Sequence, residues 1–504
     1  MLAGVATFAI EGIESREVTV EVDVRSGLPA FTVVGLPDAG VREARERVRA
    51  ALLNSGCEFP LKRLTANLAP ASLRKAGPSF DLALALAVLG ASGQAPRAAL
   101  AEYAVCGELS LGGAVRPVAG AVAIALGARR AGYARLIVPV ENAAEAAVVG
   151  EIEVCPVPDL GHLVELLQGR RRPAEAPSPP PPSRRYRCEA PDLGDVRGQA
   201  DAKRALEIAA AGGHNLLMVG APGIGKTMLA RRLPGILPPP SLSEALEITQ
   251  VHSVAGIGRG RLAVERPFRA PHHTISAQGL VGGGAIPRPG EITLAHHGVL
   301  FLDELTEFSR SALEALRQPL EDGRIEIVRG QRAIAFPSRT MLVGACNDCQ
   351  CARGRDDCTC TELDRARYAR RLSGPLLDRV DLVCRLEPSA PVSAGAWPQA
   401  EGSETVAKRV AAARELQAER LAGTSAHCNA AMDAGLTQRR ALLAAGARAR
   451  LVAAGSRNLL NGRSQDRVLR IARTVADLAG STYVGAEHFD EALGYRLAPA
   501  RSAA

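Results

Sequence analysis

The chain has 504 residues, of which 47% are hydrophobic, so it can form about two to four globular domains with ordinary cores. None of its apolar stretches reaches the roughly 18 residues that a membrane-spanning helix needs, and the N-terminal residues lack the pattern of a signal peptide. We therefore expect a soluble, unexported protein without a membrane partner, and the odd number of mostly scattered cysteines favours the reducing cytoplasm. The net charge of +8 favours polyanionic partners without identifying one.

The first 168 residues predict an α/β domain of their own. Residues 17–24 alternate between apolar and polar side chains, which is typical of a half-buried strand. Residues 41–56 predict a helix that ends at a glycine, and residues 135–140 predict another strand. The proline-rich basic segment 169–187 then predicts a semi-rigid linker.

The rest of the chain predicts two further domains. Residues 188–388 contain short apolar strands separated by helical stretches, which is the pattern of a parallel sheet with crossover helices. After a connector at 389–402, residues 403–504 are rich in alanine and arginine and have helical periodicity, so we expect a smaller all-α domain. The expected fold class is multidomain α/β.

A glycine-rich segment with the spacing of a P-loop lies between a predicted strand and a predicted helix. Backbone amides and the helix N-terminus can hold phosphate groups in such a loop, Lys226 can reach the β- and γ-phosphates, and Thr227 can bind Mg²⁺. We therefore predict ATP and Mg²⁺ as ligands. The loop consists of Gly220, Ala221, Pro222, Gly223, Ile224, Gly225, Lys226 and Thr227.

Polar residues at the ends of two later strands complement this loop. The strand 298–304 ends in Asp303, which we expect to help hold the Mg²⁺, and Glu304, which is placed to orient and deprotonate an attacking water. Asn347 ends another strand, where its side chain could contact the γ-phosphate or the water. A buried strand that ends in two solvated acids is the alternative, but a P-loop requires an acidic partner.

Two arginines could complete the site. Arg379, beside an acid and before an apolar strand, suggests a finger supplied to the site of another subunit. Arg463, at the start of a C-terminal helix, could close over the γ-phosphate, and Arg467 is the competing candidate. For each arginine taken alone, a surface salt bridge is the simpler interpretation.

Over essentially its whole length, the chain resembles the AAA+ ATPases of the magnesium-chelatase-like ComM/YifB family. Residues 266–305, 373–383 and 35–56 carry the resemblance. It implies a hexameric ring that translocates on DNA and, for ComM, a branch-migration helicase in natural transformation and recombination. It also implies the P-loop role for Lys226 and Thr227, the Walker B role for Asp303 and Glu304, sensor-1 for Asn347, the arginine finger for Arg379 and sensor-2 for Arg463.

Residues 321–339 predict a β-hairpin that could contact single-stranded or branched DNA in the pore of such a ring. A basic tip can follow phosphates irrespective of base. Residues 272–284 resemble a second pore insertion, with glycines that suit a mobile loop. The alternative is two hairpins that pack against their neighbours. The predicted tip holds Arg329, Gly330, Gln331 and Arg332, with Arg324 and Arg339 nearby.

The N-terminal domain resembles the Lon-protease fold, of the ribosomal S5 domain 2 type, and Ser79 matches the position of the Lon nucleophile. A serine needs a base, which Lon supplies as a lysine on the helix after the hairpin at 107–120. The matching region here contains no lysine. We therefore expect a domain without proteolytic activity.

Four cysteines follow Asn347 in a loop rich in arginine and aspartate. Two C-x-C pairs supply the ligand number and type of a tetrahedral zinc site, although the pairs are closer than usual. Unliganded thiols, an iron–sulfur centre and, outside the cytoplasm, disulfides are the alternatives. The candidate zinc ligands are Cys349, Cys351, Cys358 and Cys360. A metal role is the alternative for the histidine pairs 272–273 and 296–297, but adjacent strand residues point to opposite faces, so we take them as structural or interface histidines.

Three functions are compatible with these motifs. The first is a DNA motor, the second a chelatase-type ATPase subunit that drives Mg²⁺ insertion into a porphyrin, and the third an ATP-dependent regulatory scaffold. The Lon-like N-terminal domain weighs against the second function, and the intact Glu304 weighs against the third.

Overall fold

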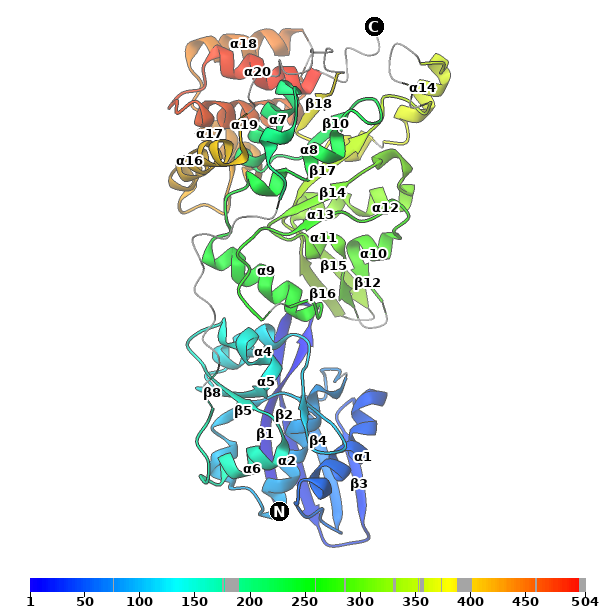
Figure 1. Ribbon diagram of the computed structural model, residues 1–504, viewed down its shortest axis with the longest axis vertical. Coiled ribbons are helices and arrows are strands. Elements are labelled where there is room, and N and C mark those ends of the chain that lie inside the picture. The colour runs from blue at the N-terminus through cyan, green and yellow to red at the C-terminus, as the bar shows by residue number, and fades with distance from the viewer. Residues whose placement is uncertain are drawn as a thin grey trace. The chain divides into compact units, whose positions relative to one another are not determined.

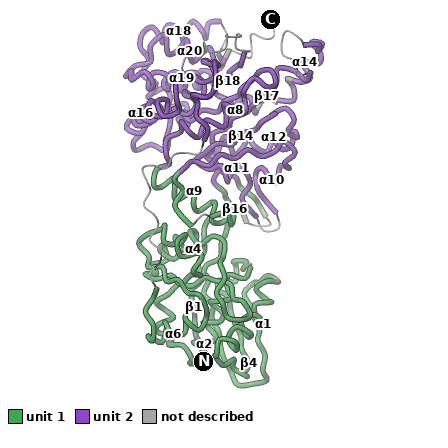
Figure 2. Tube along the Cα trace, in the orientation of Figure 1, with its two compact units in different colours: residues 1–185, 241–264, 326–336 green, residues 186–240, 265–325, 337–504 purple. Residues whose placement is uncertain are grey.

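The computed structural model divides into two compact units (Figure 2). Unit 1 comprises residues 1–185, 241–264 and 326–336, and unit 2 comprises residues 186–240, 265–325 and 337–504. No helix within the described ranges is both long enough and apolar enough to cross a membrane. The structure describes residues 1–75, 77–174, 176, 190–258, 260–284, 287–329, 332–351, 353, 358–372, 374–387, 401–457 and 460–497.

Unit 1 is built on a seven-stranded mixed sheet with the order β3-β4-β2-β1-β5-β8-β9. The long β1–β2 pair is antiparallel, with Leu2 opposite Asp23 and Glu11 opposite Glu14, whereas β5, β8 and β9 run parallel to β1 and to one another. The strands 17–24 and 135–140 expected from the sequence are confirmed. The strands are β1 (Leu2–Glu11), β2 (Glu14–Arg25), β3 (Ala30–Val34), β4 (Arg63–Ala69), β5 (Tyr103–Val105), β8 (Arg135–Pro139) and β9 (Glu153–Val157), with a separate hairpin of β6 (Glu108–Leu109) and β7 (Val115–Arg116).

Helix α2 is the central helix of unit 1, because eleven of its residues are buried. Helix α9 belongs to the same unit although it is distant in sequence: the Gly120 amide donates to the Ser253 carbonyl over 2.9 Å, and Gln250 Nε2 donates to the Ile13 carbonyl over 2.6 Å. The helices of unit 1 are α1 (Ala39–Asn54), α2 (Asp81–Ser92), α3 (Arg97–Leu100), α4 (Ala121–Arg130), α5 (Val140–Ala147), α6 (Leu160–Leu167) and α9 (Leu242–Val254).

Unit 2 contains the expected parallel sheet, with the order β11-β14-β17-β10-β18. Figure 1 labels four of these strands, β14, β17, β10 and β18. Every neighbouring pair is parallel, and the three central strands are almost wholly buried, which explains their continuous apolar sequences. The strands are β10 (Leu216–Val219), β11 (Phe268–Arg269), β14 (Val299–Leu302), β17 (Met341–Cys346) and β18 (Leu382–Arg385). The helices are α7 (Ala200–Gly212), α8 (Lys226–Ala230), α10 (Ala277–Val281), α11 (Glu291–Leu294), α12 (Arg310–Ala315), α13 (Arg317–Asp322), α14 (Glu362–Ala369) and α15 (Gly374–Leu377).

The C-terminal part of unit 2 is helical, as expected. Helices α16 and α19 pack against α7 (Figure 1). Buried polar side chains join these helices: His214 Nε2 lies 2.8 Å from Thr474 Oγ1, and Asn429 Nδ2 donates to Thr474 over 3.0 Å and to Asp477 over 2.8 Å. The helices are α16 (Ser403–Leu421), α17 (Ala434–Arg440), α18 (Ala445–Ser456), α19 (Gly462–Leu478) and α20 (Ala486–Leu497).

The hairpin expected at 321–339 forms from β15 (Arg324–Arg329) and β16 (Arg332–Pro337). Arg324 and Arg339 are exposed near its base, whereas Gly330, Gln331 and the side chains of Arg329 and Arg332 lie outside the described residues. The backbone of β16 approaches the β1–β2 turn, because a Cβ added to Gly12 would lie 2.9 Å from the Ala335 carbonyl oxygen. At least part of the hairpin therefore packs against a neighbouring element, which is the alternative to DNA contact given above.

The segment 272–284 forms a short helix and a strand. Ser276 caps α10 by accepting a hydrogen bond from the Gly279 amide, and β12 (Gly282–Gly283) then pairs with β13 (Arg288–Pro289). The glycines of β12 have φ values of +100° and +140°, which L side chains rarely adopt. They therefore serve a defined turn of the backbone.

Candidate active site

The predicted nucleotide-binding residues meet at the carboxyl edge of the parallel sheet in unit 2. The P-loop follows β10, the acidic pair follows β14, and Asn347 follows β17. Because β17 lies between β14 and β10 and all three run parallel, their ends lie side by side. In open α/β sheets, ligands bind at this edge.

The P-loop holds Lys226 in a buried, fully hydrogen-bonded position. Its Nζ donates to the carbonyl oxygens of Gly220 and Ala221 over 2.7 and 2.9 Å, and to Asn347 Oδ1 over 3.0 Å. Burial lowers the pKa of Lys226 below its ordinary value, and the neighbouring Asp303 opposes that shift. Gly223 and Gly225 have φ values of +74° and +105°, so the loop needs glycine there to turn around the lysine.

Thr227 and Asp303 form the second contact of the site. The Thr227 hydroxyl donates to Asp303 Oδ2 over 2.6 Å. A hydroxyl and a carboxylate are oxygen ligands of the kind that Mg²⁺ prefers, usually together with water and substrate phosphates. The buried lysine, the glycine-containing turn around it and this oxygen pair therefore fit Mg²⁺ and ATP.

Glu304 adopts a backbone conformation that is uncommon for a residue other than glycine. Its φ and ψ are 49° and 47°, in the left-handed region, and its amide donates to Asp303 Oδ1 over 3.0 Å. Such outliers cluster at functional sites. The turn leaves the Glu304 carboxylate more than half exposed, where it can act on a water.

His273 lies against this carboxylate. Its Nδ1 is 3.1 Å from Glu304 Oε2, and its ring contacts those of His272 and Phe308. The contact follows from the sheet, since β11 pairs in parallel with β14 and the chain after β11 therefore emerges at the same edge. The interpretation of His273 as a structural or interface histidine missed this contact, which depends on β11 lying beside β14 in the sheet.

A pocket of about 320 Å³ opens beside the P-loop. This volume is at the lower end of the range for small-molecule sites. Two residues that line the pocket, Arg197 and Gln199, lie in the segment before α7 and were not predicted, because no sequence motif marks them. Gln199 is held in place by a 2.9 Å hydrogen bond from its Nε2 to the Glu387 carbonyl. The lining residues are Arg197, Gln199, Ala221, Pro222, Gly223, Ile224 and Met228.

Arg379 does not contact the P-loop of its own chain in the part that the structure describes. Its guanidinium donates to the Glu321 carboxylate, and its carbonyl accepts a 2.8 Å hydrogen bond from Asn215 Nδ2. The side chain is largely buried, and its Nε has no hydrogen-bond partner among the described residues. A role at another subunit's site therefore remains a prediction.

The two candidate arginines of α19 differ in their surroundings. Arg463 is exposed in the first turn, behind the cap that Asn461 makes by accepting from the Ser464 amide. Arg467 is buried, and its Nε lies 4.0 Å from Asp381 Oδ1. Burial lowers the pKa of Arg467. The exposed Arg463 has the freedom to move toward a ligand, and its nucleotide-binding role stays a prediction.

The Ser79 region of unit 1 contains no base in contact with the serine among the residues that the structure describes. Ser79 is half-buried in the turn before α2; its carbonyl accepts a 3.4 Å hydrogen bond from the Gly107 amide, and its hydroxyl has no hydrogen bond within the described ranges. Lys75 is fully buried and donates to the Pro70 carbonyl. Helix α4, on which the Lon resemblance places a lysine, begins with the buried apolar residues Ala121 and Val122.

Comparisons with known proteins cover nearly the whole chain. The family models described as "Magnesium chelatase, subunit ChlI", "Subunit ChlI of Mg-chelatase" and "Magnesium chelatase, subunit ChlI C-terminal" match residues 192–393, 20–142 and 400–496. The uncharacterized protein YifB of Escherichia coli is 43% identical, and the competence protein ComM of Haemophilus influenzae is 41% identical, each over 98% of this chain and 97% of the relative. Lon protease 2 of Bacillus subtilis is 29% identical over 26% of this chain and 25% of its own length.

Proposed function

Because this chain belongs to the magnesium-chelatase-like family that includes YifB and ComM, we propose that it is a ring-forming ATPase that acts as a motor on DNA. The family is of the AAA+ ATPase type. The observation that carries the proposal is the meeting of Lys226, the Thr227–Asp303 pair and Asn347 at one sheet edge, with Glu304 beside them.

Each residue of the site has a distinct task in hydrolysis. Lys226 exchanges its bonds to the loop carbonyls for bonds to phosphate oxygens, while Thr227 and Asp303 would hold Mg²⁺. That ion neutralises charge on the β- and γ-phosphates when it is bound. Glu304 orients a water and accepts its proton, and Asn347 fixes the water or the γ-phosphate from the neighbouring strand.

The DNA part of the proposal is supported by charge and by a relative. The chain carries a net charge of +8, and Arg324 and Arg339 are exposed at the base of the β15–β16 hairpin. One relative over the full length is named a competence protein. A single-stranded or branched DNA held in a hexameric ring, as in branch migration during recombination, is the partner that we propose.

The chelatase-type ATPase subunit is the second candidate. Three family models that together cover most of the chain carry the magnesium chelatase name, and one of them matches residues 20–142. The N-terminal domain, which on the sequence alone weighs against this candidate, therefore does not separate the two functions. The full-length similarity to ComM favours the motor.

ATP hydrolysis measured with and without forked or four-way DNA tests the proposal. We expect DNA to stimulate hydrolysis and strand displacement to accompany it, and Glu304→Gln to lower hydrolysis by about 10²- to 10⁴-fold because it removes the general base. Glu307→Gln is the matched control, since Glu307 is an exposed acid three residues away that pairs with Arg371 over 3.2 Å.

An active ring that shows neither stimulation nor strand displacement would contradict the motor. Dependence of a porphyrin-metallation assay on the same ATPase would then support the chelatase candidate. Nucleotide binding and ring assembly with no hydrolysis by the unmodified protein would support a scaffold.

A further inference from the structure

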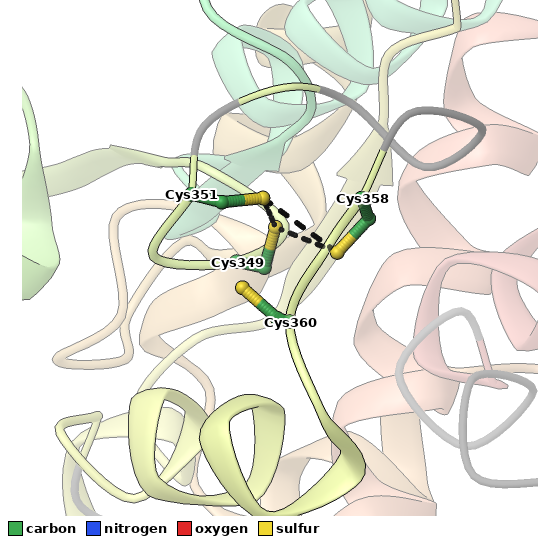
Figure 3. A group of neighbouring side chains, drawn as sticks. All are labelled: Cys349, Cys351, Cys358 and Cys360. Atoms are coloured by element: carbon green, nitrogen blue, oxygen red, sulfur yellow. Dashed lines mark hydrogen bonds between the residues drawn. The ribbon is translucent and has the colours of Figure 1, made fainter.

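Four cysteine sulfurs converge in the loop after β17 (Figure 3). Cys349 Sγ lies 3.2 Å from Cys351 Sγ and 3.3 Å from Cys358 Sγ, and the last two are 3.7 Å apart. With Cys360, all four sulfurs lie within 4.8 Å of one another. None of the four is in a disulfide. The pairs come from opposite ends of a loop, so the chain folds back to bring them together.

This arrangement has the size of a tetrathiolate metal site. A zinc–sulfur bond of about 2.3 Å places two sulfurs of a tetrahedral site roughly 3.8 Å apart. The separations among Cys349, Cys351 and Cys358 are slightly shorter, so these three thiols need to move outward by only a few tenths of an ångström to receive an ion. Thiolate ligands select zinc or iron–sulfur centres over Mg²⁺ or Ca²⁺.

The surroundings of the cluster suit a metal of this kind. Four thiolates and one Zn²⁺ carry a formal charge of −2, and the guanidinium of Arg365 lies beside Cys358 and near Cys349 and Cys360. Cys349 is buried, whereas the other three cysteines are half-buried. The site is therefore shielded on one side and open to an entering ion on the other.

We propose that these four cysteines bind one Zn²⁺ ion. Each thiol binds as the thiolate and releases its proton to solvent, so binding of the ion liberates up to four protons and no electron is transferred. The proposal concerns this chain's own side chains and does not depend on whether the substrate is DNA.

The zinc site ties together two elements of the ATPase site. On one side, Cys349 follows Asn347 by two residues, and Asp348 between them pairs with Arg385 of β18 over 2.9 Å. On the other side, Cys360 immediately precedes Thr361, which caps α14 through a capping box with Asp364.

Helix α14 then returns to the catalytic turn. The Tyr368 hydroxyl lies 2.8 Å from Thr306 Oγ1, two residues beyond Glu304. A zinc ion would thus connect the segment after Asn347 to α14, which in turn contacts the turn that contains Glu304. The metal is therefore structural, and it maintains the relative positions of Asn347 and Glu304.

Metal analysis of the full-length protein, purified without a metal-affinity tag, tests the proposal. We expect about one zinc per chain, released on modification of the thiols, and less than about 0.3 per chain in the Cys358→Ser/Cys360→Ser variant. Cys57→Ser, which changes a half-buried cysteine outside the cluster, should keep its zinc.

A second measurement uses the unmodified protein, so its result does not depend on whether the variant folds. Exchange of its metal for Co²⁺ should give the absorption bands of a tetrahedral tetrathiolate site. Less than about 0.3 zinc per chain together with four freely titrating thiols would overturn the proposal, as would iron with the visible spectrum of an iron–sulfur centre.

The structural role has its own test. Removing the zinc should lower ATP hydrolysis or ring assembly while DNA affinity is retained. Loss of DNA binding with normal hydrolysis would show instead that the cluster serves the DNA-binding surface. Because zinc content is measured without DNA, failure of the motor proposal leaves this test intact.

Discussion

Lys226 in unit 2 and Ser79 in unit 1 lie in comparable places, each in a tight glycine-containing loop that leads into a helix. The Lys226 ammonium bonds to a side chain from another strand, Asn347, and the next residue bonds to a third strand end through Asp303. Around Ser79, the nearby lysine donates to a backbone carbonyl and the helix that should supply a base begins with apolar side chains.

The difference between the two loops lies in the elements that surround them. Parallel strands bring residues that are about 75 and 120 positions apart to one edge of the sheet, so a P-loop acquires its partners through the topology. In unit 1 the corresponding element, α4, is present with the wrong side chains. A loop sequence therefore indicates an activity only when the neighbouring elements also carry the required groups.

The largest effect on ATP hydrolysis is expected for substitution of Arg379, which tests whether a second copy of the chain completes the site in unit 2. Arg379→Ala should lower ATP hydrolysis by about 10³- to 10⁵-fold if the guanidinium acts as a finger on a neighbouring site. Glu321→Ala removes the same ion pair and leaves the arginine in place, so it should retain most of the activity. Steady-state hydrolysis of both variants measures the difference.

Mixed rings make the test specific for action between subunits. Arg379→Ala subunits combined with Glu304→Gln subunits should regain hydrolysis, because some sites then contain an intact Glu304 and receive an intact Arg379. Equal losses in Arg379→Ala and Glu321→Ala, or no recovery in rings shown to be mixed, would mean that Arg379 supports its own chain.

A smaller effect is expected at His273, which binds the Glu304 carboxylate from the segment that leads into α10. His273→Ala should free the carboxylate and raise basal hydrolysis by about 1.4- to 5-fold, in line with the roughly 0.2–1 kcal/mol of a contact between exposed polar side chains. If the segment 272–284 reports DNA binding, stimulation by DNA should fall in the same variant.

His272→Ala is the matched control for this change, since His272 Nδ1 contacts Thr274 Oγ1 over 2.9 Å instead of the Glu304 carboxylate. Hydrolysis rates with saturating ATP, with and without DNA, measure both effects. Identical behaviour of the two variants would remove His273 from the regulation of Glu304.

The sequence was sufficient to locate the site residues that directly follow a buried apolar strand. Asp303 and Asn347 were identified in this way, because the pattern of buried strands implies a common edge. The His273 contact, the Gln199 side of the pocket and the Glu321 partner of Arg379 were not predicted. They depend on strand order and on loop paths, which periodicity along one chain does not determine.

The placement of α9 was unpredictable for a related reason. Its sequence lies within the expected ATPase domain, yet its hydrogen bonds to Ile13 and Gly120 assign it to unit 1. The sequence of α9 has no strong amphipathic pattern and several of its buried residues are polar, so it does not indicate which element the helix packs against. The convergence of the four cysteines was easier to predict, since they lie within twelve residues of one another in the sequence.

For substitution of Ser79 we expect no change in ATP hydrolysis. Ser79→Ala should leave ATP hydrolysis unchanged, and the unmodified protein should neither cleave an unfolded protein substrate nor react with a fluorophosphonate probe, because a serine without a base remains a weak nucleophile. Gel analysis of the substrate and of probe labelling checks this, with an active Lon protease as the positive control. Labelling that disappears in Ser79→Ala would show that a base reaches this hydroxyl in solution. Unit 1 would then hold a second active site instead of a Lon-like fold without activity.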